Sequence, residues 1–461
     1  MLKRVLLLVG CVALLLLSWS TVLAMDTPVQ KQAVLIRLAN EEIANETPFN
    51  AIEYLTQAVN YSTSETFDAL ETLKNIYDKL GYAKEYFNVL ERQVSRADCK
   101  PDVFKELADY YIEKNKLMEA FDVLNTGIGK TGDAGLIEFY EQHRYTYTFS
   151  RESFEDVTAY HNGGIQIKLG GLWGLANTTG GIIIPCEYEQ LSTVDTVGNG
   201  SIVALRDDRK VVTLNMKNQV VAILNADIKQ IGGFSQNVVS LQLSNDKWVL
   251  ANNKLLVGET QYDGIGTAMN SAIAVKMADG WGVSALDGKV IIPFEYGEII
   301  ADELGRSYAQ GAAFVKKDGR VYLYAGGVLL PEAYEDAQPF TNDGWAAVKK
   351  DGKWGYIDVT GTVKIDFQFE NALSFSQGLA AVKLSSQTIN VEPEESDEEN
   401  VEVEAKTEVV ELWGYINTSG KTVIEPVFYK AKSFTSGNAP VLTRLGWQFI
   451  SLVEYQKGSG F

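Results

Sequence analysis

The chain has very few of the residues that most often carry catalysis or bind metals. Among 461 residues there are two histidines and three cysteines. His143 and His161 have no cysteine or acidic cluster beside them at metal-ligand spacing, so both are expected to be ordinary residues at the surface or at a domain boundary. A nucleophile elbow, a phosphate-binding loop and a dinucleotide fingerprint are also missing. The sequence therefore predicts no catalytic residues, no metal ligands and no cofactor.

Cysteine is too scarce for a disulfide framework. Cys11 lies in an N-terminal apolar segment, while Cys99 and Cys186 lie in different predicted domains. The disulfide-rich folds of small secreted domains are therefore excluded.

Positive charge is scarce as well. The chain has 41 lysines and arginines against 60 aspartates and glutamates, which gives a net charge of −19. Binding to nucleic acid or to an anionic membrane surface needs a basic face. Nucleic acid is therefore not expected as a partner.

The N-terminus has the pattern of an export signal. Lys3 and Arg4 precede the apolar run Val5–Leu17, and Val22-Leu23-Ala24 forms a small-residue cleavage site. A signal peptide at residues 1–24 and an extracellular or cell-envelope location are predicted. The alternative is an uncleaved segment Val5–Ala24, about 20 residues long, which would anchor the protein in a membrane. The membrane is a partner only in that alternative.

Residues 30–144 show apolar positions at helical spacing and a repeat of 34 residues. Leu73, Tyr77 and Leu90 recur as Leu107, Tyr111 and Leu124. The second copy resembles a tetratricopeptide repeat in its packing positions, which are Phe104, Leu107, Ala108, Tyr111, Ala120, Leu124 and Gly127. The first copy departs from that motif, because Lys74 and Tyr86 stand at its two small positions. The resemblance implies antiparallel helix pairs in a short helical repeat domain.

In such repeats the first helix of each pair lines a concave groove, so the outward positions of those helices are candidate binding residues. They are Asp68, Glu71, Asn75, Asp78, Asp102, Lys105 and Asp109. This mostly acidic set predicts a groove for a basic or neutral segment of a partner protein. The alternative is a solvated charged face without a ligand.

Residues 145–455 contain a second repeat, marked by pairs of tryptophan and glycine. The pairs are Trp173-Gly174, Trp281-Gly282, Trp354-Gly355 and Trp413-Gly414. Each tryptophan is followed by a turn glycine seven positions later and by tyrosine or phenylalanine fifteen positions later. The glycine beside each tryptophan is expected to permit close approach of another backbone. Burial in the core is expected for the tryptophans, and stacking on sugars is the alternative.

The clearest repeat unit, Gly344–Phe375, contains three short strands and an exit segment. Degenerate units around residues 211–214, 247–250, 321–324 and 447–450 bring the array to eight. The last unit lacks a third strand, and Tyr145–Phe149, before the first unit, resembles one. These complementary ends predict a closed, propeller-like ring. An open β-solenoid is the alternative, because units of mostly 33 to 40 residues are short for four-stranded blades.

Residues 387–411 interrupt this array with a run of acidic residues. Their composition predicts a disordered, solvated acidic loop. The segment lacks the fixed ligand spacing and turn glycine of a calcium-binding loop.

The pattern in Trp354–Ile365 and Trp413–Ile424 resembles the bacterial WG-repeat family. It consists of Trp-Gly-Tyr-Ile-Asp/Asn, a turn glycine and an apolar strand. The two resemblances together predict an α+β multidomain protein, with a helical repeat segment followed by an all-β repeat domain. They imply an exported, non-enzymatic binding or scaffold protein with a protein partner. The alternative is a carbohydrate- or cell-wall-binding protein, in which carboxylates from different blades could act on a glycan.

Overall fold

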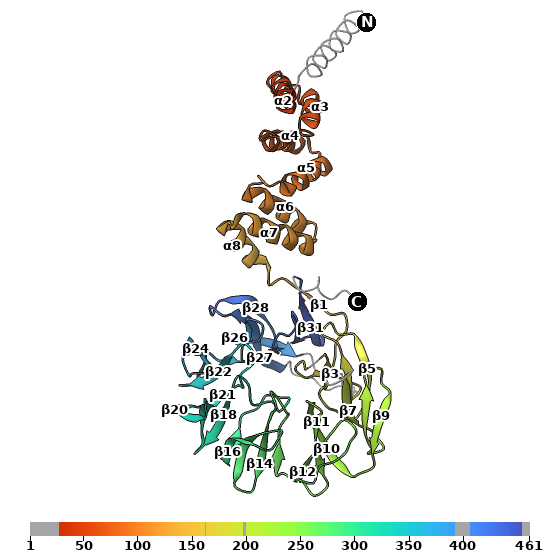
Figure 1. Cartoon of the computed structure of the whole chain (residues 1–461), viewed down its shortest axis with the longest axis vertical. Coiled ribbons are helices and arrows are strands. Elements are labelled where there is room, and N and C mark those ends of the chain that lie inside the picture. Colours follow the sequence, from red (N-terminus) through yellow and green to blue (C-terminus); the bar gives the residue numbers. More distant parts are fainter. Residues whose placement is uncertain (1–26, 162, 197–199, 392–405, 454–461) are drawn as a thin grey trace, which may run out of the picture. The chain divides into compact units, whose positions relative to one another are not determined.

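The chain divides into two compact units, Met1–Arg144 and Tyr145–Phe461. The computed structural model describes residues 27–161, 163–196, 200–391 and 406–453 (Figure 1). The predicted signal peptide at residues 1–24 lies outside these ranges. Across the described ranges, no helix combines the length and the apolar character that a membrane span requires.

The first unit consists of helices joined by tight turns. The described helices are α2 (Pro28–Ala44), α3 (Pro48–Ala58), α4 (Thr66–Leu80), α5 (Ala83–Ser95), α6 (Pro101–Glu113), α7 (Leu117–Thr131) and α8 (Ala134–His143). Proline occupies the first turn of α2, α3 and α6. Backbone N–H groups of the first turn have no acceptor within the helix, so the N–H that proline lacks costs no helical hydrogen bond there. Gly81 and Gly132 end α4 and α7 in the left-handed conformation, with φ of 72° and 63°.

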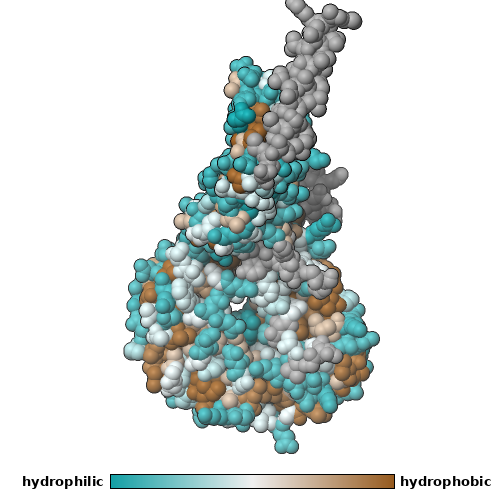
Figure 2. Space-filling model, turned by 45° about the horizontal axis from the view of Figure 1, so that its top comes forward, coloured by the Kyte–Doolittle hydropathy of each residue, from teal (hydrophilic) through white to brown (hydrophobic). Residues whose placement is uncertain are grey.

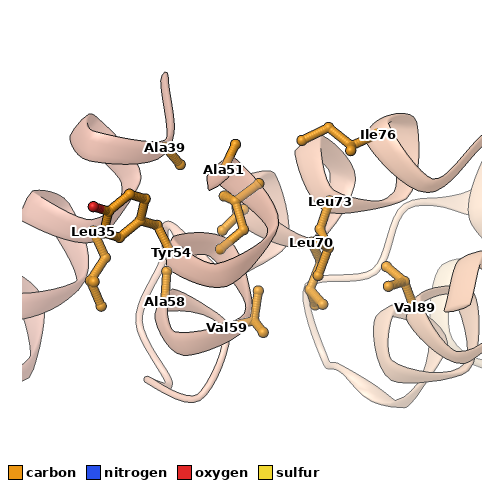
Figure 3. Packing of buried hydrophobic residues seen from close by; sticks show 12 residues of the cluster. Leu35, Ala39, Ala51, Tyr54, Ala58, Val59, Leu70, Leu73, Ile76 and Val89 are labelled. Atoms are coloured by element: carbon orange, nitrogen blue, oxygen red, sulfur yellow. The ribbon is translucent and has the colours of Figure 1, made fainter. Parts of the chain in front are cut away.

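The apolar faces of the first helices pack into a continuous core. Figure 3 shows Leu35 of α2 beside Tyr54 of α3, with Leu70 of α4 further along the stack. Ala51 and Ala58 of α3 are fully buried, so neighbouring helices approach closely on that face. Full burial of a leucine side chain contributes roughly 1.5–3 kcal/mol, and this core stabilises the short helices.

The 34-residue sequence repeat coincides with the helix pairs α4–α5 and α6–α7. Leu73 and Leu107 take equivalent buried positions on α4 and α6, and Leu90 and Leu124 do so on α5 and α7. The sequence repeat is therefore also a repeat of packing positions.

The pair α6–α7 depends on small residues. Ala108 and Ala120 are buried, and a Cβ built on Gly127 would lie 2.7 Å from a ring carbon of Phe104. No side chain larger than hydrogen fits at Gly127 unless Phe104 moves.

The second unit is an eight-bladed β-propeller of small antiparallel sheets (Figure 1). The first blade contains β2 (Asp156–Val157), β3 (Ile165–Leu169), β4 (Leu172–Ala176) and β5 (Ile182–Tyr188), and the second contains β6 (Gln190–Leu191), β7 (Ser201–Leu205), β8 (Val211–Asn215) and β9 (Val220–Leu224). The third blade contains β10 (Ile228–Ser235), β11 (Val238–Leu243) and β12 (Trp248–Ala251). The fourth contains β13 (Gly264–Ile265), β14 (Ala272–Met277), β15 (Gly280–Ala285) and β16 (Val290–Tyr296). The fifth and sixth blades are β17 (Glu298–Ile299), β18 (Ala312–Lys317), β19 (Arg320–Ala325) and β20 (Val328–Tyr334); β21 (Asp336–Ala337), β22 (Trp345–Lys350), β23 (Lys353–Asp358) and β24 (Val363–Phe369). The last two are β25 (Asn371–Ala372), β26 (Leu379–Val391), β27 (Lys406–Asn417) and β28 (Thr422–Phe428); β29 (Lys430–Ala431), β30 (Asn438–Thr443), β31 (Gly446–Leu452) and β1 (Tyr147–Phe149).

A very short inner strand allows these short units to form four-stranded blades. In every blade except β10–β12 the first strand has two residues, as in Asn371–Ala372 of β25. The sequence interpretation placed these residues in the exit segment and assigned only three strands to a unit. Because an inner strand needs so few residues, about 35 residues suffice for a blade, and the open solenoid is wrong.

The ring closes with strands from both ends of the unit. In the last blade β1 pairs with β31, which places Tyr147 opposite Leu452 and Thr148 opposite Ser451. The prediction that the segment before the first unit supplies the strand missing from the last is confirmed. Closure leaves no incomplete blade at either end.

The glycine of each Trp-Gly pair faces the backbone of the next strand. A Cβ built on Gly282 of β15 would lie 2.5 Å from the carbonyl oxygen of Ile292 in β16, and one on Gly414 of β27 would lie 2.4 Å from that of Ile424 in β28. The register of β15 and β16 shifts at this point, which marks a bulge. The predicted close approach of another backbone is confirmed.

The other fixed spacings of the repeat follow from strand register. The tryptophan lies directly opposite the aromatic residue fifteen positions later, in the pairs Trp173–Tyr188, Trp281–Tyr296, Trp354–Phe369 and Trp413–Phe428. The turn glycines all have positive φ; they are Gly180 (91°), Gly288 (93°), Gly361 (83°) and Gly420 (78°). Each motif therefore encodes one hairpin of fixed length.

Both ends of the predicted disordered insertion, residues 387–411, form strands. Strands β26 and β27 extend into it, and Gln387 to Val391 pair with Val410 to Lys406. Threonine, isoleucine and valine in this segment favour extended structure. The sequence interpretation considered only the acidic composition and therefore missed these strand ends. Residues 392–405, which contain most of the glutamates, lie outside the described residues.

Candidate functional site

The inner strand of most blades leads into a loop at the inner rim of the propeller. Loops after β2, β13, β17, β21, β25 and β29, together with Trp413 and Trp447, line a cavity of about 710 Å³. This volume lies within the roughly 300–1,000 Å³ of typical ligand sites. The cavity is the candidate binding site of the propeller.

Hydroxyl groups tie several of these loops to the next blade. In each case a threonine or serine hydroxyl donates to a backbone carbonyl of the following blade, in the pairs Thr267–Leu304, Thr341–Phe375 and Ser376–Phe434. The N–H of Gly437 also donates to Gln377 Oε1 at 3.0 Å. Because these bonds hold the rim backbone, the walls of the cavity are preorganised.

The loop between β17 and β18, residues 300–311, is longer than its counterparts 338–344 and 373–378. Asp302 organises it, because Oδ1 accepts the N–H groups of Leu304 and Arg306, each at 3.0 Å. Its other oxygen, Oδ2, accepts from Arg306 Nε at 2.7 Å. The carboxylate therefore fixes both the turn and the direction of the guanidinium.

Two side chains of this loop contact distant blades. Arg306 Nη1 lies 3.4 Å from His161 Nδ1, which belongs to the first blade. Glu303 forms an ion pair with Lys432 of the last blade. The loop itself belongs to the fifth blade, so these contacts cross the interior of the ring (Figure 1).

His161 is buried at this crossing, with 9% of its surface exposed. Burial and, secondly, the Arg306 guanidinium lower the pKa of His161 to about 4, while Asp302 opposes the shift. A guanidinium can only donate hydrogen bonds, so Nδ1 accepts and the imidazole is neutral at pH 7. The sequence interpretation, which expected a surface or boundary residue, missed this role because the partner Arg306 lies in a distant blade.

Lys432 is the second cation at the crossing. Its ammonium lies 5.1 Å from the centre of the Trp447 ring, and its side chain is 14% exposed. The backbone oxygen of Lys432 accepts the Tyr415 hydroxyl at 2.8 Å. An ion pair, a cation–π contact and a backbone hydrogen bond thus all fix the position of Lys432.

The walls of the cavity carry balanced charge and several amides. The acidic residues are Asp156, Asp302, Glu303 and Asp343, the basic ones Arg306, Lys430 and Lys432, and the amides Gln338, Asn342 and Gln377. Throughout the described ranges there is no group of three or more His, Cys, Asp or Glu residues arranged to hold a metal ion. Balanced charges, amides and ring edges suit an uncharged polar ligand better than a strongly charged one.

The helical unit has a second hollow, of about 440 Å³, on α5 and α6. Three of the sequence-predicted groove residues line it, namely Asp102, Lys105 and Asp109. The other four do not line it and lie on α4: Asp68, Asn75 and Asp78 are exposed, and Glu71 is half-buried. The structure therefore supports a smaller acidic hollow than the groove expected from the sequence.

Sequence reasoning missed four residues of this hollow. They are Tyr86, Glu106, Tyr110 and Glu113. Asp102, Glu106, Asp109 and Glu113 follow one another at intervals of four, three and four, so helical periodicity could have placed them on one face.

A polar cluster beside the hollow explains why Lys74 and Tyr86 replace the two small residues of the repeat motif. Lys74 Nζ lies 2.7 Å from Glu106 Oε2 and 3.1 Å from Glu71 Oε1, and the Tyr86 hydroxyl donates to Glu106. Burial disfavours the charged ammonium, but its bonds to Glu106 and Glu71 outweigh this and raise the pKa of Lys74. Gln93 donates to Glu71 at 2.8 Å. The cluster links α4, α5 and α6 where the motif has small residues.

Fold and inner rim together define the second unit as a β-propeller repeat domain. The family described as WG containing repeat matches residues 173–194, 281–320, 325–354, 354–386 and 413–443. Residues 173–443 therefore carry WG repeats, and a helical region precedes them in the chain, so the resemblance predicted from the sequence is confirmed.

The comparison with solved structures gives matches of low identity and low TM-score. The computationally designed Ika8 protein is 11% identical, with a TM-score of 0.41 over 68% of this chain and 100% of that one. BamB from Moraxella catarrhalis is 9% identical, with a TM-score of 0.37 over 66% of this chain and 95% of that one. No protein of curated function matches this chain.

Proposed function

We propose that this chain is an exported, non-enzymatic scaffold whose helical and WG repeats hold other macromolecules, with a protein as the main partner. The repeat β-propeller fold supports a binding role in general. The main observation in support of a protein partner is the acidic hollow on α5 and α6. Export is proposed from the charged, apolar and small-residue pattern of residues 3–24.

The hollow suits a basic segment. Asp102, Asp109 and Glu113 are exposed around it, with Lys105 as the single cation of its lining. Tyr86 and Tyr110 offer apolar ring surface together with a hydroxyl, a combination common at protein interfaces. Complementary charge speeds association and excludes acidic competitors.

The test begins with capture of partners from an envelope extract of the source organism. The baits are residues 25–461 and the two units divided at Tyr145, and proteins retained by the helical unit are identified and purified. Binding of each purified partner is then measured against Asp102→Lys/Asp109→Lys. We expect at least about a tenfold loss, because two attractive charges become repulsive.

The matched control is Glu46→Lys/Glu53→Lys, which changes net charge equally at exposed positions outside the hollow. It should bind as the unchanged chain does. Unchanged binding by the Asp102/Asp109 variant would reject the hollow as the site.

Carbohydrate binding by the propeller is the second candidate. It is favoured by the cavity lining, where Trp413, Trp447 and Tyr160 lie among amide side chains. Against it, Phe149 is the one aromatic residue among the well-exposed large hydrophobic residues of the described propeller, so a set of well-exposed rings for stacking on sugars is missing from the described blades. Retention of the propeller unit on insoluble wall polymer, lost when soluble glycan is added, would establish this candidate in place of the protein scaffold.

A further inference from the structure

The outer strands of the blades form open sheet edges around the propeller. An open edge can pair with another chain, and natural proteins block this with proline, charged residues or very short strands. Such residues occur in five outer strands: Pro185 in β5, Pro293 in β16, Pro331 in β20, Lys364 and Asp366 in β24, and Pro426 in β28. In the last blade β1 is only three residues long. In the third blade residues 252–263 cover β12 through bridges at Trp248 and Ala251.

Strand β9 has none of these protections. It reads Val-Val-Ala-Ile-Leu, without proline or charge, and it is the terminal strand of the sheet β6–β9. Val220, Val221 and Ile223 are 48%, 62% and 54% exposed. Figure 2 shows hydrophobic surface at several places around the circumference of the propeller. Among these outer strands β9 combines the longest unprotected edge with the most exposed apolar side chains.

We propose that β9 pairs in antiparallel fashion with β9 of a second copy of this chain. A symmetric dimer needs a self-complementary surface, since the same residues come from both subunits. An uncharged strand meets this condition, because no like charges are placed opposite one another. Pairing joins two blades into one continuous sheet and covers the exposed valines and isoleucine.

The residues flanking β9 specify the register and the partner. Pairing centred on Ala222 places Val220 opposite Leu224 of the second copy. The same symmetry brings the turn that holds Lys217 towards the segment that holds Asp227 of the second copy, since each is five residues from Ala222. Both side chains are exposed, and neither takes part in an ion pair among the described residues. In the proposed dimer Lys217 of each copy thus lies near Asp227 of the other, with one such ion pair at each end of the paired strands. This complementarity favours a second copy over an unrelated strand.

The dimer is expected to be weak and concentration-dependent. A pair of five-residue strands buries far less than the roughly 1,600 Å² of a standard protein interface. Sedimentation velocity of the chain without residues 1–24 should therefore show the average mass rising from one chain towards two between about 1 and 500 µM. A mass of one chain throughout this range would overturn the proposal.

Val221→Lys tests the strand itself. It places two ammonium groups near the centre of the pair and should weaken association at least about tenfold. The matched control is Val290→Lys at a 50% exposed position of β16, which should associate as the unchanged chain does. Equal association of Val221→Lys and the unchanged chain would overturn the proposal.

A charge exchange tests the register without altering the strand. Lys217→Asp should weaken the dimer, because it places two aspartates opposite each other, and Lys217→Asp/Asp227→Lys should restore it. A double variant as weak as the single one would overturn the pairing centred on Ala222. Tryptophan fluorescence during unfolding confirms that each variant remains folded.

Discussion

The glycine beside each repeated tryptophan illustrates how one residue decides a local structure. Its role is not flexibility, because Gly174, Gly282, Gly355 and Gly414 have no positive φ. The constraint is space: the carbonyl oxygen of the neighbouring bulged strand lies where a Cβ would stand. The glycine of the Trp-Gly motif is thus required for steric reasons, because the blade leaves no room for a side chain at that position.

We predict that Gly282→Ala destabilises the propeller by about 1–3 kcal/mol, because the new methyl group would lie 2.5 Å from the Ile292 oxygen. Denaturant unfolding followed by tryptophan fluorescence measures this change. All tryptophans after residue 24 lie in the propeller, so the signal reports on that unit alone. Gly297→Ala is the control, since its nearest contact would be an ordinary 3.5 Å to the Lys316 oxygen. Equal loss in both variants would contradict the steric explanation.

His161 predicts a pH dependence of propeller stability. An ordinary histidine titrates near 6.5 in the unfolded chain, whereas the folded pKa is about 4. Between these values the unfolded chain binds more protons, so the free energy of unfolding falls as pH drops from 6.5 towards 4. The full difference corresponds to roughly 3 kcal/mol at 1.36 kcal/mol per pKa unit.

His161→Gln should remove this part of the acid sensitivity, because glutamine still accepts a hydrogen bond from Arg306 but does not titrate. Unfolding curves of both proteins at several pH values between 4 and 7 make the comparison. Carboxylates contribute equally to both, so the difference isolates the histidine. Parallel pH profiles would show that His161 titrates normally in the fold.

The helices of the first unit show how one element can depart from a repeat motif and keep the packing. On α6 and α7 the contact is made by small residues, as in Ala108 and Ala120. On α4 and α5 the same positions hold Lys74 and Tyr86, and both bond to Glu106 of α6. A hydrogen-bonded cluster replaces the close contact and couples three successive helices.

We predict that Lys74→Met destabilises the helical unit by about 1–3 kcal/mol, because Glu106 loses its cation in a half-buried site. Lys74→Met/Glu106→Gln should recover at least half of that loss, since the glutamine oxygen still accepts the Tyr86 hydroxyl. Unfolding followed by the helical circular dichroism signal provides the measurement. Additive losses in the two substitutions would mean that the residues are not coupled.

One short strand pairs the two ends of the propeller unit with each other. Strand β1 has three residues, yet it completes the last blade and closes the ring. Tyr147 of this strand also lies 5.8 Å from Phe428, between ring centres. Repeat arrays whose ends are not joined unfold from those ends, so closure should make unfolding more cooperative.

Replacing β1 by Tyr147→Gly, Thr148→Ser and Phe149→Gly should therefore lower the free energy of unfolding by about 2–4 kcal/mol. The transition should also broaden in tryptophan fluorescence. Leu445→Ser, at a 73% exposed position of the same blade, is the control and should leave the transition unchanged. An unaltered transition after loss of β1 would show that the ring is stable without this closure.

Prediction from sequence succeeded where the pattern is local. Turn glycines, the Trp-Gly strands and the 34-residue helical repeat follow from residues close together in the chain. Prediction failed at the two-residue inner strands, because such a segment carries too few residues for any periodicity. It also failed for His161 and for Glu106, whose partners are separated from them by 145 and up to 32 residues.

The sequence by itself determined the repeat class, the blade length and the ends that close the ring, because hairpin turns and strand spacing are short-range properties. Tertiary structure alone decided which side chains share the cavity and the acidic hollow. It also decided that β9 is the exposed apolar edge among better protected ones. Those properties arise when distant blades and helices are brought together, and no spacing along the chain records that.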